Sequence, residues 1–419
     1  MKPGDPSVIS EWLTRSQKAP LTVIAEFNDS DEHPPCRYQD DATATFDDND
    51  HVEVCPRHRA ILSLDQPLPH RSRIRDLTIF LYSSDPDWDE DGLDGEPTLL
   101  YHHFFAKALP NLEYLDFRAA HVEQIIDVIP VPDSLFAGFV PRLKELKYLG
   151  VVRGLVETVK NLTSCEIGSW LESSGPAIIH PDQLRVFLNN NETLKSFTIN
   201  ASEPFTFKHS ESAPTPMTNL EFLRIECYLD VYFEEFISII HAPQFKDLHT
   251  VQLSLSSTIQ AVATDSFGHT FQFARTNADN VRFEPLQHFG AAITTLRLDR
   301  GITLRQLGCK PALYNFFRSL DTVQVLEFHG SIANYVLNAL SATGVPPRLR
   351  VILVAVGLDD CKRSLRVLAA ISKRRMDEGN PFMVIEPLLV EGEVELEKGF
   401  HVEWEEGYKA ENTQDLLSN

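Results

Sequence analysis

A short pattern of apolar residues recurs along this chain: an apolar residue, two others, a second apolar residue, one other, and a third apolar residue. It begins at ten positions, which are Ile74, Leu112, Leu143, Leu162, Leu194, Leu220, Leu248, Ile293, Val323 and Leu349. The second position is polar in all ten segments, and the fifth is polar in nine, the exception being Leu353. Chance clustering of apolar residues would not keep both positions polar, whereas a strand with one buried face would. The pattern therefore predicts a series of similar strands.

The spacing of these segments predicts how the chain returns between strands. Most intervals can hold one short strand and one helix, as in the longer leucine-rich repeats. The 19 residues from Leu143 to Leu162 leave room for little more than a turn, and the 45 residues before Ile293 predict an extra loop or hairpin around residues 256–283. The expected fold is an α/β leucine-rich-repeat solenoid, with a curved parallel sheet on the concave face and helices and loops on the convex face.

Apolar residues at helical spacing occur between several of the expected strands. Pro181 and Asp182 suit a first helical turn, and a basic run at residues 373–375 followed by Gly379 suits a helix end, where a cation interacts well with the helix dipole. The three apolar stripes are Leu184, Phe187 and Leu188; Phe233, Phe236, Ile237 and Ile240; and Leu365, Leu368 and Ile371.

These patterns divide the chain into three parts. Residues 1–20 are expected to form an N-terminal cap segment, residues 21–390 the solenoid, and residues 391–419 an acidic C-terminal tail. Residues 28–58 and 83–97 are rich in acidic residues and poor in large apolar ones. We expect both to be solvated acidic loops, and we expect residues 28–58 to pack loosely and to bind no metal.

Charge limits the possible partners. The chain has 38 Lys and Arg against 60 Asp and Glu, a formal charge of −22. Such a surface repels phosphate backbones and anionic lipid, so we expect no nucleic acid and no membrane, and we favour a protein partner with a basic face. No apolar run is long enough to span a membrane, residues 1–10 lack the apolar core of a signal peptide, and the six cysteines are scattered. An intracellular protein, in the cytoplasm or nucleus, is expected.

Three stretches of the sequence could form a metal or phosphate site, but for each of them an ordinary surface loop is the favoured interpretation. The residues His33, Cys36, His51, Cys55 and His58 could ligate zinc, but their spacing matches no zinc-finger template. Asp47, Asp48 and Asp50 lack the glycine and glutamate of a calcium loop, and residues 150–154 lack the lysine of a phosphate loop. We therefore expect no catalytic residues, no metal and no cofactor.

Several stretches resemble the fungal family of F-box and leucine-rich-repeat proteins. They are SEWLTRSQKAPLTVI at residues 10–24, HRSRIRDLTI at 70–79, LPNLEYLDF at 109–117, PRLKELKYLGV at 141–151, NLTSCEI at 161–167, PDQLRVFLNNNETLKSFTI at 181–199 and MTNLEFLRI at 217–225. In that family an F-box docks on the Skp-type adaptor of a cullin–RING ubiquitin ligase, and the repeats present a substrate. Only eleven residues precede Trp12 here, too few for an F-box. The resemblance thus implies a substrate-recognition half, either of a longer protein whose F-box is missing from this sequence or of a relative that kept this half alone, and adaptor binding by the chain as given is not expected.

The leading interpretation is a protein-binding module, because the third and fifth positions of each strand should point out of the concave sheet. The expected partner-binding residues are Tyr114, Asp116, Lys147, Glu166, Thr198, Phe222, Arg224, Gln252, Arg297 and Glu327. We expect the leucines beside them, Leu115, Leu146, Leu223 and Leu296, to be buried, while Asp116, Lys147, Arg224 and Arg297 are at least partly exposed. The alternative is an enzyme, or a regulatory subunit of one, with a carboxylate-rich pocket.

Overall fold

The structure is a computed structural model, and its described residues form two compact units, residues 1–243 and 244–419. The described residues are 6–28, 67–82, 107–119, 136, 139–149, 159–168, 181–201, 213–227, 237–255, 259–275, 292–298, 321–329, 333–343, 346–355, 358–382 and 384–387. Nearly all of the acidic loops, the whole tail 391–419 and the zinc and calcium candidates lie outside these ranges, so those expectations stay predictions.

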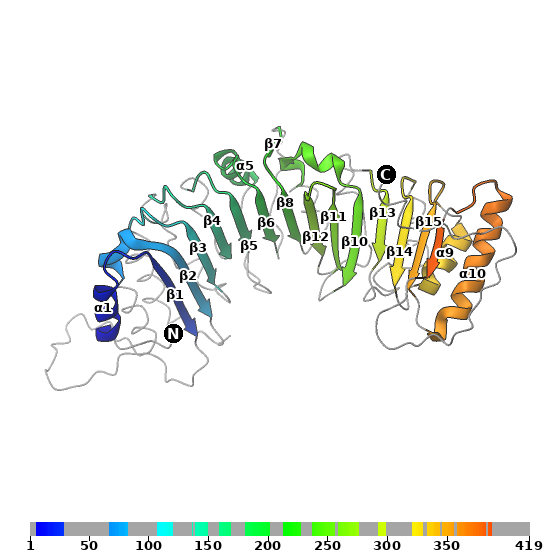
Figure 1. The fold of residues 1–419 in the computed structure, drawn as a ribbon. Coiled ribbons are helices and arrows are strands. Elements are labelled where there is room, and N and C mark those ends of the chain that lie inside the picture. The colour runs from blue at the N-terminus through cyan, green and yellow to red at the C-terminus, as the bar shows by residue number, and fades with distance from the viewer. Residues whose placement is uncertain are drawn as a thin grey trace, which may run out of the picture. The chain divides into compact units, whose positions relative to one another are not determined.

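The first unit is a parallel sheet whose strands follow one another in sequence order (Figure 1). Its strands are β1 (Leu21–Asn28), β2 (Ile74–Tyr82), β3 (Tyr114–Ala119), β4 (Glu145–Leu149), β5 (Ser164–Gly168), β6 (Ser196–Ala201) and β8 (Phe222–Cys227). The other described elements are α1 (Pro6–Arg15), the 3-10 helix η1 (Leu68–Arg73), α5 (Pro181–Asn190), and the short paired strands β7 (Thr215–Pro216) and β9 (Ile240–His241).

The second unit combines an antiparallel hairpin with four further parallel strands. Strand β10 (Thr250–Leu255) pairs with β11 (Ile259–Thr264), which pairs with β12 (Thr270–Arg275), both antiparallel. On its other side β10 begins a parallel series of β13 (Thr295–Leu298), β14 (Val325–His329), β15 (Val351–Ala355) and β16 (Val384–Pro387). The hairpin confirms the extra element expected within residues 256–283. The remaining elements are η4 (Pro243–Asp247), α9 (Ala333–Thr343) and α10 (Leu358–Asp377).

The apolar positions of the repeat form the core of both units. The first position is buried in all ten segments, with exposed fractions of at most 8%. The fourth and sixth positions are buried wherever their side chains are described, and Leu115, Leu146, Leu223 and Leu296 are at most 1% exposed, as expected. From Leu112 onward, each strand begins at the third position of its segment. The alternation of buried and polar residues therefore assigned the strand faces correctly.

A turn precedes most of these strands and contains an apolar position that the sequence pattern omitted. The N–H of the first-position residue donates to the carbonyl three residues earlier, as from Leu112 to Leu109 and from Leu220 to Met217. Leu109 and Met217 are fully buried. The segments that begin at Leu112 and Leu220 are thus anchored to the core before their strands begin.

A backbone contact at the second position joins successive repeats. The carbonyl of Lys144 accepts hydrogen bonds from the N–H groups of Thr163 and Ser164, at 2.8 and 3.1 Å. The carbonyl of Lys195 accepts from Glu221 and Phe222 in the same way, at 2.7 and 2.8 Å. This contact fixes the register before the sheet hydrogen bonds start.

The buried residue Asn191 connects α5 to the segment that leads into β5. Its Oδ1 accepts from the N–H of Leu162 at 2.9 Å, and its Nδ2 donates to the carbonyls of Val159 and Phe187 at 3.1 and 2.8 Å. Asn191 is 0% exposed. A polar side chain buried so completely is stable only because these hydrogen bonds replace water.

Helix α5 packs on the apolar face of the sheet, as its sequence predicts. Leu184, Phe187 and Leu188 are buried, and the Phe187 ring lies 6.4 Å from that of Phe197 in β6. The stripe predicted at residues 233–240 is only partly described. Its last residue, Ile240, lies in strand β9 rather than in a helix, so that prediction is wrong at its end.

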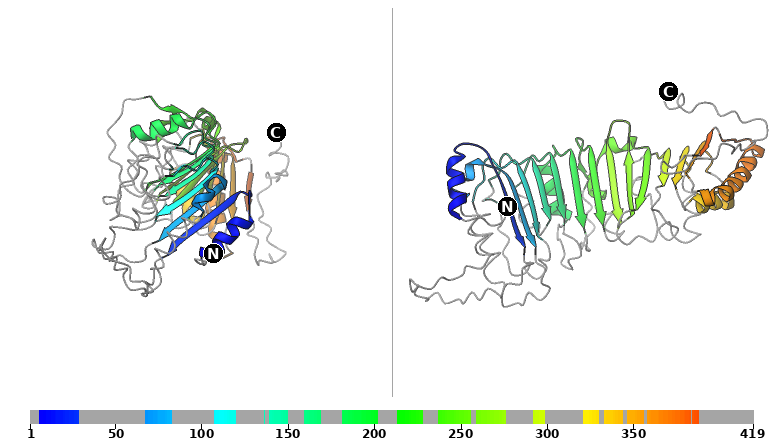
Figure 2. Two further views of the ribbon diagram at one scale, coloured as in Figure 1. Left: turned by 90° about the vertical axis from the view of Figure 1, so that its left-hand side faces the viewer. Right: turned by 60° about the horizontal axis from the view of Figure 1, so that its bottom comes forward.

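Helix α10 lies beside α9 in the second unit (Figures 1 and 2). Leu368 and Ile371 are buried, and Gly379 ends the helix with a φ of 75°. The two arginines of the basic run contact carbonyls outside α10: Arg374 donates to those of Leu340 and Ser341 in α9, and Arg375 to that of Leu349. They therefore do more than interact with their own helix dipole.

In each unit the described residues thus form mixed α/β structure in which each repeat adds one strand to a mostly parallel sheet. This is compatible with the expected α/β repeat architecture.

Candidate functional site

The polar positions of the repeat line up on one face of each sheet. In the first unit, cross-strand register places Asp116, Lys147, Glu166, Thr198 and Arg224 in one line over β3, β4, β5, β6 and β8. A second line runs through Tyr114, Glu145, Ser164, Ser196 and Phe222. We call these two lines the polar face. It includes every expected partner-binding residue of this unit, on the side opposite the buried leucines.

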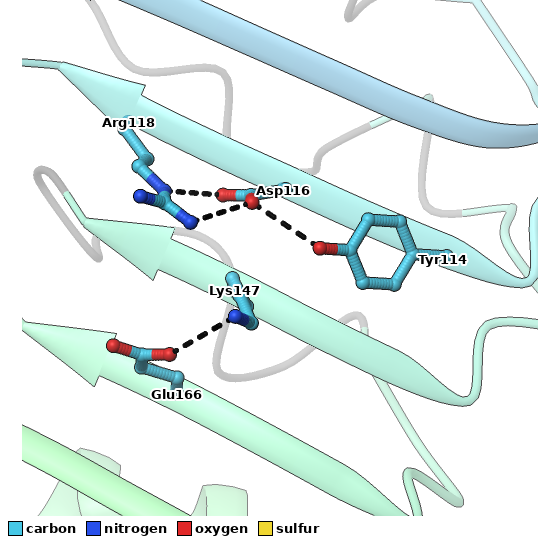
Figure 3. A network of polar contacts seen from close by, with 5 residues as sticks. All are labelled: Tyr114, Asp116, Arg118, Lys147 and Glu166. Atoms are coloured by element: carbon cyan, nitrogen blue, oxygen red, sulfur yellow. Dashed lines mark hydrogen bonds and ion pairs between the residues drawn. The ribbon is translucent and has the colours of Figure 1, made fainter. Parts of the chain in front are cut away.

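Tyr114, Asp116 and Arg118 form a hydrogen-bonded cluster at one end of the polar face (Figure 3). Arg118 donates to Asp116 through Nε and Nη2, at 2.8 and 2.9 Å, and the Tyr114 hydroxyl donates to Oδ2 of Asp116 at 3.2 Å. The Arg118 guanidinium also lies over the Phe80 ring, 5.1 Å from its centroid. Two charge-assisted bonds in a forked geometry hold the carboxylate rigidly.

Asp116 is more buried than we expected. It is 4% exposed, although its position in the strand faces away from the core. The strand alternation correctly predicted that the Asp116 side chain points away from the core, but the predicted exposure was wrong. Arg118 and Tyr114, on the same strand face, contact its carboxylate and cover it. The accessible groups at this end of the face are therefore Tyr114 and Arg118, which are partly exposed.

The cluster changes the protonation of the groups that surround Asp116. The pKa of Tyr114 is raised to about 12, first by burial and then by the charge of Asp116 and the hydrogen bond to it. The hydrogen bond to Asp116 also raises the pKa of Arg118. The cluster therefore holds a protonated phenol and a guanidinium beside one carboxylate, an arrangement suited to binding rather than to proton abstraction.

Opposite charges alternate over the first three residues of the first line, Asp116, Lys147 and Glu166. Lys147 Nζ lies 3.7 Å from Glu166 Oε2 on the next strand, and both side chains are about one third exposed, at 40% and 34% (Figure 3). At the other end Arg224 Nη2 binds Glu226 Oε2 at 2.8 Å. Since neighbouring strands are only about 4.8 Å apart, like charges in this line would repel.

The second unit carries the remaining expected residues on its own sheet. Gln252, Arg297 and Glu327 are in register on β10, β13 and β14. Arg297 Nε lies 3.0 Å from Glu327 Oε2, and Gln252 and Arg297 are exposed. These residues form a short polar line of the same kind as in the first unit.

Sequence reasoning missed Arg118 and Glu226. Both lie two residues beyond the fifth position of the repeat, on the same strand face. Continuing the alternation by one residue past the sixth position would have found them. It was not continued because the pattern ended at its last apolar residue.

The turn of the β11–β12 hairpin holds a separate polar cluster. Asp265 Oδ1 accepts from the N–H groups of Phe267 and His269, at 2.8 and 3.0 Å, and its Oδ2 lies 2.7 Å from Nδ1 of His269. Burial alone would raise the pKa of Asp265, but these hydrogen bonds lower it. Gly268, with a φ of 91°, completes the turn.

Within the described ranges, no group of three or more His, Cys, Asp or Glu could hold a metal ion. None of the helices described here is long and apolar enough to cross a membrane. Neither a scan against protein-family models nor a search of curated proteins finds a match for this chain.

Proposed function

We propose that this chain is a leucine-rich-repeat protein that binds another protein through the polar face, as the substrate-recognition half of an F-box-type ubiquitin ligase receptor does. The observation that carries the proposal is the register of the polar face. It presents acidic, basic, hydroxyl and aromatic side chains on five adjacent strands, across about 19 Å. Such a row can contact an extended partner at several points.

Three residues of the polar face are suited to carry most of the binding energy. Phe222 and Arg224 lie two residues apart on β8 and are partly exposed, and Lys147 is partly exposed on β4. Aromatic and arginine side chains dominate the energetics of protein interfaces. The ion pairs of Lys147 and Arg224 hold their side chains in place before binding, which lowers the entropy lost on association.

Charge favours a partner with a basic face. The chain carries −22 overall, so it attracts such a partner over a distance. The polar face itself contains both signs, and it would select among basic partners by local complementarity. An enzymatic role has less support, because Asp116, Glu166 and Glu226 are each engaged by a basic side chain.

A matched pair of triple variants tests this proposal. The first is Lys147→Ala, Phe222→Ala and Arg224→Ala. The control is Lys160→Ala, Phe139→Ala and Arg142→Ala, which removes the same residue types from exposed positions outside the polar face. Proteins captured from cell extract are identified by mass spectrometry, and binding of the purified partner is then measured by calorimetry.

We expect the first variant to weaken binding by at least about 30-fold, since a single hot-spot residue is worth about 2 kcal/mol or more. The control should bind as the wild type does. Equal binding by both variants, with unchanged folding, would show that the polar face is not the interface.

A further inference from the structure

The outward face of helix α10 combines basic and apolar side chains. Arg366, Ala369, Ala370, Lys373 and Met376 are all exposed and follow one another at helical spacing. We call them the α10 face. Met376 is 54% exposed, although it is a large apolar side chain. The opposite side of the helix is buried through Leu368 and Ile371, so these five residues make no contribution to the core.

The α10 face is unusual in so acidic a chain. The two exposed basic residues lie seven residues apart, or about 10 Å along the helix axis. Further exposed arginines, Arg348 and Arg350, flank Leu349, whose carbonyl accepts a hydrogen bond from Arg375 near the end of α10. Asp377 and Glu378 follow at the helix C-terminus. A ligand for this face should therefore be acidic and should also bring apolar groups for Met376 and the alanines.

The chain itself contains a segment with those properties. Residues 391–406, EGEVELEKGFHVEWEE, hold seven glutamates and one lysine, interleaved with Val394, Leu396, Phe400, Val402 and Trp404. This segment follows the last described residue, Pro387, by four positions. Its composition is the complement of the α10 face in both charge and apolar character.

The connectivity brings the two together. Strand β16 runs parallel to β15, and its last residue, Pro387, pairs with Val354. Helix α10 begins at Leu358, four residues after Val354. The end of β16 and the start of α10 therefore lie at the same edge of the sheet. Arg366 and Lys373 lie about 12 and 22 Å along α10 from Leu358. On random-coil statistics 8 residues span about 16 Å and 18 residues about 23 Å, which is long enough to bring glutamates near positions 395 and 405 to the two basic residues.

We propose that segment 391–406 docks on the α10 face of the same molecule, with its glutamates paired with Arg366 and Lys373. Tethering gives the segment an effective concentration on the order of 1 mM. A site with a dissociation constant of about 0.1 mM would then be occupied about 90% of the time. This contact would cover Arg366 and Lys373 and exclude other acidic ligands from the α10 face.

Hydrogen exchange and cross-linking of the full chain test the proposal. At low micromolar protein and low salt, backbone amides of residues 391–406 should exchange about tenfold more slowly than in the variant Arg366→Glu/Lys373→Glu, which follows from the occupancy above. A carbodiimide should link Lys373 to glutamates of the segment within one molecule. Both signals should fall in high salt, which screens exposed charges.

Two controls separate docking from loss of structure. The variant Arg142→Glu/Lys160→Glu reverses two exposed charges of the first unit and should keep the protection. Adding Glu395→Lys/Glu405→Lys to the α10 variant reverses both sides and should restore it. The proposal is overturned if residues 391–406 exchange equally fast in the wild type and the α10 variant, if the double reversal restores nothing, or if the Lys373 cross-links join different molecules.

Discussion

At the scale of single residues, Tyr114 reports on the buried carboxylate of Asp116. Because the pKa of Tyr114 is raised to about 12, the stabilisation from its protonated form is complete below the ordinary pKa of about 10. It is lost as pH rises through about 12. The ultraviolet difference titration between wild type and Tyr114→Phe should show this phenol ionising near pH 12. Asp116→Asn should lower its pKa, and an unchanged value would contradict the role given to Asp116.

Asn191 is the residue whose loss should cost most for its size. Asn191→Ala leaves the N–H of Leu162 and the carbonyls of Val159 and Phe187 buried without the side-chain partner that Asn191 supplies. We expect a loss of at least about 1–3 kcal/mol in the free energy of unfolding. Urea denaturation measures it. Asn189→Ala, at an exposed position of the same helix, should change stability by less than about 0.5 kcal/mol.

At the scale of elements, strand β8 carries a core residue and a residue of the polar face side by side. Leu223 is 0% exposed, so Leu223→Ala should cost roughly 2–5 kcal/mol through the cavity it leaves. Arg224 lies on the polar face, and its pair with Glu226 is partly exposed. Arg224→Ala should therefore cost no more than about 1 kcal/mol. Similar losses from both substitutions in chemical denaturation would contradict the assigned strand register.

The β11–β12 hairpin should be sensitive to acid. The lowered pKa of Asp265 means that its stabilising contribution is present above the ordinary carboxyl pKa of about 3.9 and is lost as pH falls through the folded value. Asp265→Ala should speed hydrogen exchange at residues 265–270, because hydrogen bonds to a charged group are worth about 1.5–3 kcal/mol. The exchange rates of these amides, corrected for the pH dependence of intrinsic exchange, should reach those of the variant in the wild type only at acid pH. Wild-type protection no greater than that of Asp265→Ala at neutral pH would argue against a role for the carboxylate.

At the scale of the whole molecule, the net charge of −22 should reduce stability at low salt. Raising the ionic strength shortens the Debye length from about 30 Å at 0.01 M to about 10 Å at 0.1 M. Long-range repulsion is screened most by this change, whereas the short ion pairs of the polar face are screened less. We therefore expect the thermal midpoint to rise with added sodium chloride. A midpoint that falls would mean that surface ion pairs outweigh the net repulsion.

Much of the strand architecture could be predicted from the sequence. The period of two along each strand fixes which residues face the core, and its regular recurrence predicted parallel strands that pair in order. The extra hairpin before Ile293 followed from the length of one interval. Leu223 was correctly placed in the core and Arg224 on the polar face, because these properties depend only on neighbours along the chain.

The positions that sequence reasoning missed depend on contacts between segments far apart in the sequence or beyond the repeat pattern. Asp116 is buried because Arg118 and Tyr114 fold over it, and Ile240 joins a strand because Thr215 pairs with it. Arg374 contacts α9 through carbonyls more than thirty residues away. No local pattern encodes the partners of Ile240 and Arg374, which lie more than twenty residues away.

The sequence by itself determined the period, the core positions and the polar face of each strand, since one-sided burial imposes a pattern on consecutive residues. The tertiary structure decided which polar groups are exposed, which protonation states are favoured and which helix ends are capped. These depend on distances across the sheet and between helices, where a hydrogen bond is made or lost over less than 1 Å.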